Sequence, residues 1–115
     1  MKKLQLIIVS VLLHLSVFSQ IDTAYIHTFG GAHNEKIFQI KEAPGNTFIS
    51  VGYTGSYGYG NSDIYLLKTD SVCNKIWSKY IGGSGVEWGY SVVPTLDNGF
   101  AIAGYTGSTD SSGYD

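Results

Sequence analysis

One segment of this chain repeats itself without a gap at an offset of 52 residues. When residues 29–63 are aligned with residues 81–115, 11 of the 35 positions are identical. The identical positions are Gly30-Gly31 and Gly82-Gly83, Glu35 and Glu87, Asn46 and Asn98, Phe48 and Phe100, residues 52–56 and 104–108, and Asp63 and Asp115. A repeat of this length is typical of stacked or radial repeat proteins, most often of propeller blades of about 40 to 50 residues.

The pattern within each repeat predicts a meander of short antiparallel strands. Between residues 37 and 81, β-rich runs with a period of two alternate with turn residues at regular spacing. We expect the strands of the first repeat at residues 37–42, 47–53, 63–69 and 75–81. The second repeat predicts the first two strands again, at residues 89–94 and 100–106.

Residues 23–29 align with the fourth strand of the repeat, so that Tyr25 takes the place of Trp77. Many propellers close their ring by pairing such a strand with a blade from the other terminus, which removes exposed sheet edges. We therefore predict an all-β fold, an incomplete β-propeller of four-stranded antiparallel blades with a 52-residue period. It comprises a fourth strand at 23–29, a complete blade at about 30–81 and a partial blade at 82–115.

Both faces of the predicted strands are apolar or small. In the second strand, Ile49 and Val51 alternate with Phe48, Ser50 and Gly52, whereas a sheet with one wet face alternates apolar with polar residues. Neighbouring sheets on both sides explain this pattern, because one blade in water buries too little apolar surface to offset its ordering entropy. We expect the chain to be the amino-terminal piece of a longer protein, or to assemble with other copies.

The first 19 residues have the organisation of a cleaved signal peptide. Two lysines precede an apolar run over residues 4–18, and the small-residue spacing at Val17 and Ser19 predicts cleavage before Gln20. The alternative is a retained membrane anchor, but polar residues interrupt the run, which is shorter than the ~20 residues needed to span a bilayer. We expect a secreted or cell-surface protein whose mature chain does not insert into the membrane.

The charge of the predicted mature chain argues against two classes of partner. Its 96 residues contain five lysines, no arginine and nine carboxylates, which gives a formal charge of −4. Nucleic-acid binding needs clustered Lys and Arg, and an anionic membrane surface also attracts basic segments. Cys73 is the sole cysteine in the sequence, so no disulfide forms within one chain, and no His or Lys cluster beside it predicts a reactive thiol.

Four motifs of this chain are Gly-Tyr-Thr-Gly-Ser at 52–56, Asp-Ile-Tyr-Leu-Leu-Lys-Thr-Asp at 63–70, Trp77, and Gly-Gly at 82–83. Together they resemble the repeat of the secreted propeller-repeat proteins that are common in Bacteroidetes. The resemblance extends over residues 22–115. It implies a repeat architecture and no particular activity, and full-length members commonly end in a sorting domain used for type IX secretion. The family usually has glycine in the turn before the tryptophan. This chain has Cys73 and Asn74 there, and we expect Asn74 to adopt the positive φ.

The recurring carboxylates do not suggest a catalytic or metal-binding arrangement. Asp63 and Asp115 share a register, which is compatible with one calcium ligand from each blade, but calcium takes six to eight oxygens. We therefore interpret each aspartate as the first residue of a strand, whose carboxylate accepts hydrogen bonds from backbone N–H groups of the preceding loop. Asp70 is expected to cap the turn that follows it. Glu35 and Glu87 occur once per repeat, so we expect blade-to-blade contacts rather than a catalytic pair.

No catalytic, cofactor-binding or metal-binding residue is predicted. A zinc site at His27 and His33 would need two further ligands, so both are interpreted as surface histidines. The sequence has no nucleophile elbow, and its glycine pairs follow strands without opening a helix, so they are not phosphate loops.

The segment at residues 57–62, Tyr-Gly-Tyr-Gly-Asn-Ser, has the composition of a recognition loop. Its alternative interpretation is a solvated connection whose tyrosines pack on the blade edge. The function that we predict is an extracellular or cell-surface binding module for a protein or glycan, without catalytic activity of its own. The alternatives are a secreted propeller enzyme, a hydrolase or lyase whose active site lies in other blades, and a spacer for a downstream domain.

Overall fold

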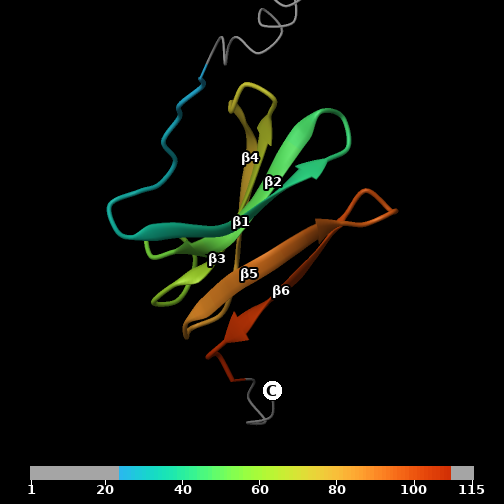
Figure 1. Ribbon diagram of the computed structural model, residues 1–115. Coiled ribbons are helices and arrows are strands. Elements are labelled where there is room, and N and C mark those ends of the chain that lie inside the picture. Colours follow the sequence, from blue (N-terminus) through green and yellow to red (C-terminus); the bar gives the residue numbers. More distant parts are fainter. Residues whose placement is uncertain (1–23, 110–115) are drawn as a thin grey trace, which may run out of the picture.

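The computed structural model describes residues 24–109, which form two antiparallel β-sheets and no helix (Figure 1). The first sheet is a meander of four strands: β1 (Glu35–Ala43), β2 (Thr47–Thr54), β3 (Asp63–Asp70) and β4 (Lys75–Ile81). The second sheet is a hairpin of β5 (Glu87–Pro94) and β6 (Phe100–Thr106). The predicted all-β class and antiparallel pairing are confirmed. Within these residues, no helix is long and apolar enough to cross a bilayer.

Three turns use residues with positive φ, which lets each chain reversal stay tight. Asn46 and Asn98, which are equivalent in the two repeats, have φ values of 57° and 63°. In the turn between β3 and β4 the left-handed residue is Cys73, with φ of 65°, and not Asn74 as expected. Asn74 instead donates its backbone N–H to Asp70 Oδ1 at 2.8 Å and its side-chain amide to Oδ2 at 3.1 Å. The predicted capping role of Asp70 is therefore confirmed.

Both repeats carry the same irregularity in their first strand. The register of β1 against β2 shifts between Ile37 and Gln39, and that of β5 against β6 shifts between Gly89 and Ser91. Each shift is a β-bulge that brings a carbonyl of the first strand close to a glycine of the second. A Cβ at Gly52 would overlap the carbonyl of Lys36. The repeated glycine is thus required by close backbone approach.

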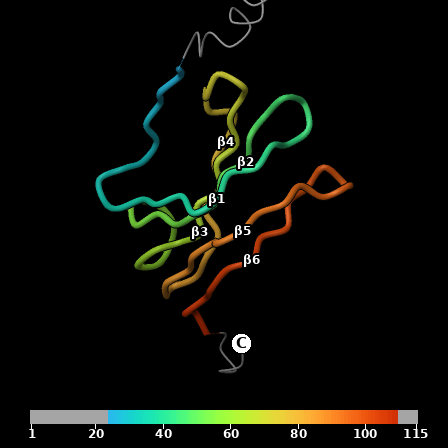
Figure 2. The backbone as a smooth tube through the Cα atoms, in the orientation of Figure 1, coloured from blue at the N-terminus to red at the C-terminus, as the bar shows by residue number. Residues whose placement is uncertain are grey.

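The second sheet packs against one face of the first, with β5 beside β1, β2 and β3 (Figure 2). The core between them consists of Ala43, Ile49, Val51, Leu66 and Val92, with Ile64, Trp77, Phe100 and Ile102 at its margin. Gln39 links the two sheets, because its Oε1 accepts hydrogen bonds from Val92 N at 2.7 Å and Ser91 Oγ at 3.0 Å. Gly89 lies where a Cβ would overlap Val51.

The lone strand predicted at residues 23–29 is not formed over residues 24–29. A strand exists only where a neighbour accepts and donates its backbone hydrogen bonds, and none of β1 to β6 pairs with this segment. The two sheets do not close into a ring. The signal peptide predicted at residues 1–19 lies outside the described residues.

Candidate binding site

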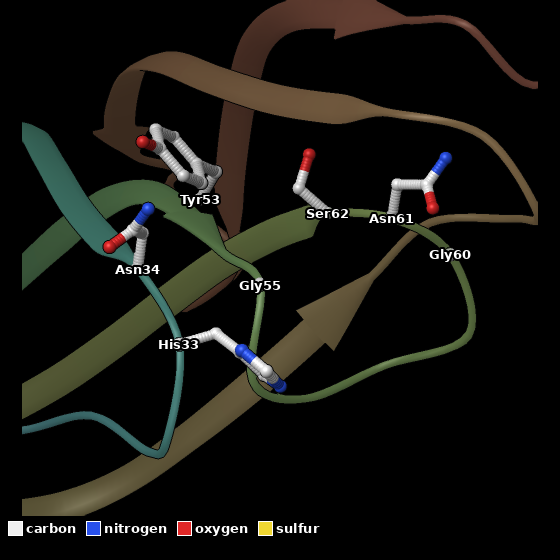
Figure 3. A pocket seen from close by; sticks show the side chains of 7 residues that line it. All are labelled: His33, Asn34, Tyr53, Gly55, Gly60, Asn61 and Ser62. Carbon is white, nitrogen blue, oxygen red and sulfur yellow. The ribbon is translucent and has the colours of Figure 1, made fainter.

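An open hollow of about 420 Å³ lies at the end of the first sheet, where β2 ends and β3 begins (Figure 3). Three segments line it: the residues before β1, the end of β2, and the end of the loop between β2 and β3. The lining residues are His33, Asn34, Tyr53, Gly55, Gly60, Asn61 and Ser62. The hollow therefore combines residues that are nearly 30 positions apart in sequence.

Hydrogen bonds fix the wall formed by the residues before β1. Gly55 N donates to the carbonyl of Asn34 at 2.8 Å, which continues the pairing of β1 and β2 beyond Glu35. His33 N donates to Ser56 Oγ, also at 2.8 Å. Because both backbone groups are held, the side chains of His33 and Asn34 project from a defined backbone (Figure 3).

The second sheet fixes the opposite wall. Asn61 N donates to the carbonyl of Gly85 at 2.9 Å, and Glu87 N donates to the carbonyl of Ser62 at 2.8 Å. Trp88 Nε1 donates to Ser62 Oγ at 3.1 Å, and the Trp88 ring lies 5.5 Å from that of Tyr53. The hollow is thus held in shape by the junction of the two repeats.

The chemistry of the lining is polar without fixed charge. Asn34 and Asn61 each offer an amide donor and acceptor, Tyr53 and Ser62 offer hydroxyls, and His33 offers an imidazole. None of the seven lining residues carries a carboxylate, an ammonium or a guanidinium group. Such a surface pairs with neutral groups that both donate and accept hydrogen bonds.

The two tyrosines of the predicted recognition loop have different environments. Tyr57 donates its hydroxyl to the carbonyl of Gly30 at 3.1 Å, and its ring stacks on Tyr80 with centroids 5.0 Å apart. It packs on the sheet edge, as the alternative interpretation expects. Tyr59 is 91% exposed and immediately precedes Gly60 of the lining. The ring of Tyr59 is therefore exposed in the same loop that supplies Gly60, Asn61 and Ser62 to the lining.

The hollow is particular to the first repeat. His33 and Asn34 correspond to Gly85 and Val86 at the 52-residue offset, so the polar wall before β1 has no counterpart before β5. Sequence reasoning selected residues 57–62 but missed Asn34 and Tyr53, and it interpreted His33 as an ordinary surface residue. The signal that points to this wall is the difference between the two repeats, not their similarity.

The recurring glutamates form the same network inside each repeat. Glu35 accepts hydrogen bonds from Thr54 Oγ1 at 2.8 Å and from Gly31 N at 3.2 Å. Glu87 accepts the equivalent bonds from Thr106 Oγ1 at 3.2 Å and from Gly83 N at 2.9 Å. The side chain of each glutamate joins the glycine pair to the Thr-Gly-Ser run of its own repeat. The expected contact between repeats is made by Glu87, whose backbone N–H donates to the carbonyl of Ser62 in the first repeat.

These hydrogen bonds stabilise the charged carboxylates. Hydrogen bonding from the Ser56 side chain, followed by Thr54 and Gly31, lowers the pKa of Glu35 against the opposing effect of partial burial. Burial alone would raise the pKa of Glu87, but hydrogen bonds from Ser108, Gly83 and Thr106 together outweigh it and lower that pKa. Two ionised, fully bonded carboxylates are structural groups and are poor proton donors.

Asp63 is completely buried at the start of β3. Its Oδ2 accepts hydrogen bonds from the backbone N–H groups of Tyr59 at 3.1 Å and Gly60 at 3.2 Å. The predicted role at the strand entrance is therefore confirmed. Its Oδ1 is buried and has no hydrogen-bond partner within the described part of the chain. The equivalent Asp115 lies outside the described residues.

Other residues considered for chemistry lie apart from the hollow. His27 stacks on Phe29 with ring centroids 6.3 Å apart. Cys73 is a half-buried free thiol in the turn between β3 and β4. Over residues 24–109, no group of three or more His, Cys, Asp or Glu residues is arranged to hold a metal ion.

Comparison with known proteins gave no match: no family model, no curated protein and no solved structure is significantly similar to this chain. The resemblance to secreted propeller-repeat proteins therefore depends on the motif residues alone.

Proposed function

We propose that this chain is part of an exported β-propeller repeat protein that binds a neutral glycan or a protein segment outside the cell, without catalysis of its own. The observation that carries this proposal is the polar hollow whose lining has no carboxylate, ammonium or guanidinium group, with the exposed Tyr59 in the loop that supplies part of that lining. Amide and hydroxyl groups pair with sugar hydroxyls or peptide groups, which both donate and accept hydrogen bonds. An exposed tyrosine adds a rigid, amphipathic surface at low entropic cost.

The propeller architecture is supported by how the two repeats resemble each other in detail. Each repeat has the same bulge opposite the same glycine, and the same glutamate network. The second sheet packs face to face on the first, as one blade packs on the next. In the complete assembly the remaining blades come from a longer chain or from other copies, and the ring they form removes the free sheet edges.

Export is supported by the two lysines and the apolar run of residues 4–18. A signal peptidase would release a chain that begins at Gln20. The amino-terminal sequence of the protein recovered from the medium or the cell surface checks this directly. Recovery of the uncleaved chain in the membrane fraction would contradict it.

The binding proposal is tested on an array of neutral and acidic oligosaccharides, with a display library of unstructured peptides as the second probe. Asn61→Ala changes one lining group and Tyr59→Ala removes the exposed ring of the same loop, and each is expected to weaken binding about tenfold, the equivalent of about 1.4 kcal/mol. Leu96→Ala is the matched control, because Leu96 is fully exposed in the β5–β6 turn at the other end of the strands. If no probe binds, or if Leu96→Ala weakens binding equally, the hollow is not the binding site.

A further inference from the structure

Two residues in equivalent positions of the repeats differ sharply in exposure. Val92 on β5 is 1% exposed, whereas Ile40 on β1, which precedes it by 52 residues, is 60% exposed. The two side chains occupy the same register position: Ile40 lies opposite Ser50, and Val92 lies opposite Ile102. The difference therefore arises from what covers them, and not from the conformation of their own strands.

The first sheet covers Val92. Val92 belongs to the core cluster with Ile49 and Val51, which project from β2 toward the second sheet. The corresponding face of the first sheet is covered only in part: Ser50 and Leu67, which share this face with Ile40 by their strand register, are 6% and 5% exposed. Ile40 on β1 and Ile76 on β4 leave 60% and 49% of their surface exposed there. We call this surface, defined by Ile40, Phe48 and Ile76, the free face of the first sheet.

The second sheet exposes the surface that this free face would need. Ile49 and Val51, which receive Val92, correspond to Ala101 and Ala103 on β6 at the 52-residue offset. Both alanines are exposed on the side of the second sheet that faces away from the first. The two alanines are smaller than Ile49 and Val51, which leaves space on the second sheet. Ile40 is larger than Val92, so the first sheet presents a larger side chain that fits this space.

We propose that the free face of the first sheet docks on the outward face of the second sheet, defined by Ala101 and Ala103, of a second copy of this chain. The contact repeats, between two molecules, the interface that already joins the two sheets within one chain. The inference depends on the stacking of repeats in the proposed function. Because the two surfaces differ, the contact is heterologous and joins molecules head to tail. Successive copies then form a ring if the rotation closes and a filament if it does not.

The test measures the mass of the purified protein by light scattering and by sedimentation velocity across a concentration series. The native protein is expected to shift from one chain to multiples of one chain as concentration rises. Ile40→Asp and Ala103→Asp each place a charge on one of the two surfaces and are expected to give monomers. Leu96→Asp, at an exposed site on neither surface, is expected to assemble as the native protein does. Circular dichroism verifies that each variant is folded.

A mixture of Ile40→Asp and Ala103→Asp decides the geometry. Each variant retains the surface that the other has lost, so the mixture is expected to form one-to-one heterodimers that do not grow further. A native protein that stays monomeric at every concentration overturns the proposal, as does a mixture that stays monomeric. Tyr59→Ala is expected to leave the mass unchanged, so a failure of ligand binding and a failure of assembly are distinguished.

Discussion

The carboxylates of Asp63 and Glu87 meet at Gly82, at the junction of the two sheets. A Cβ atom at Gly82 would overlap both Asp63 Oδ1 and Glu87 Oε2. Asp63 is fully buried and Glu87 is 3% exposed. Glu87 Oε2 already accepts a hydrogen bond from Gly83 N, whereas Asp63 Oδ1 has no partner within the described part of the chain. A buried polar oxygen without a hydrogen-bond partner costs free energy, because it has lost its bonds to water.

Asp63→Asn is expected to stabilise the protein at neutral pH by about 1 kcal/mol. The amide oxygen keeps the hydrogen bonds from Tyr59 N and Gly60 N, while the amide nitrogen replaces the unpartnered Oδ1 and donates toward Glu87. Asp63→Ala removes the acceptor from both N–H groups and is expected to destabilise by about 1 to 3 kcal/mol. Urea unfolding compares the three proteins. Equal destabilisation by both substitutions would contradict the cost that we assign to the unpartnered Asp63 Oδ1.

Gly52→Ala is expected to destabilise the protein by about 2 to 4 kcal/mol, because the added Cβ overlaps the Lys36 carbonyl at the bulge of β1. The obstacle is backbone, so no side-chain rotation relieves it. Gly55→Ala is the control, since its nearest neighbouring atom would be 3.4 Å from the new Cβ. Thermal unfolding measures both variants. A loss at Gly55 as large as that at Gly52 would show that close approach at the bulge is not the cause.

Acid is expected to destabilise the protein as the pH falls below the ordinary glutamate value of 4.5, because the pKa values of Glu35 and Glu87 are lowered in the folded state. A carboxyl whose folded pKa lies below its unfolded pKa contributes stability above the unfolded value and loses it as the pH falls through the folded value. Glu87→Gln is expected to reduce stability at neutral pH and to flatten this dependence. Unfolding free energies from about pH 7 to about pH 3 test it. An unchanged slope in the variant would refute the assignment.

Cys73→Gly is expected to stabilise the turn between β3 and β4 by up to about 1 kcal/mol, since glycine adopts the positive φ of this position without the Cβ penalty. Asn74→Gly is expected to destabilise it, because the Asn74 side-chain bond to Asp70 is lost. Chemical unfolding under reducing conditions separates the two effects. The reverse order of stability would place the left-handed residue at Asn74.

Local sequence signals were sufficient for most of the secondary structure. The strands begin and end within about two residues of their predicted positions, as expected for element boundaries. Proline, glycine and asparagine mark the reversals, and the alternation of apolar residues marks the strands between them. The 52-residue offset also identified residues that have equivalent roles, because Glu35 and Glu87 make the same hydrogen bonds in the two repeats.

Tertiary contacts decided the rest. The segment 24–29 has the pattern of a strand but forms none, because pairing depends on a neighbour that local sequence does not supply. The bulge at Gly52 and the meeting of Asp63 with Glu87 arise from close approach between segments that are distant in sequence. The polar hollow likewise exists because the register of β1 on β2 and the docking of β5 bring His33, Asn34 and Asn61 together. Repetition in the sequence determined the unit of structure, and packing between the units determined which of its surfaces are buried and which are open to a partner.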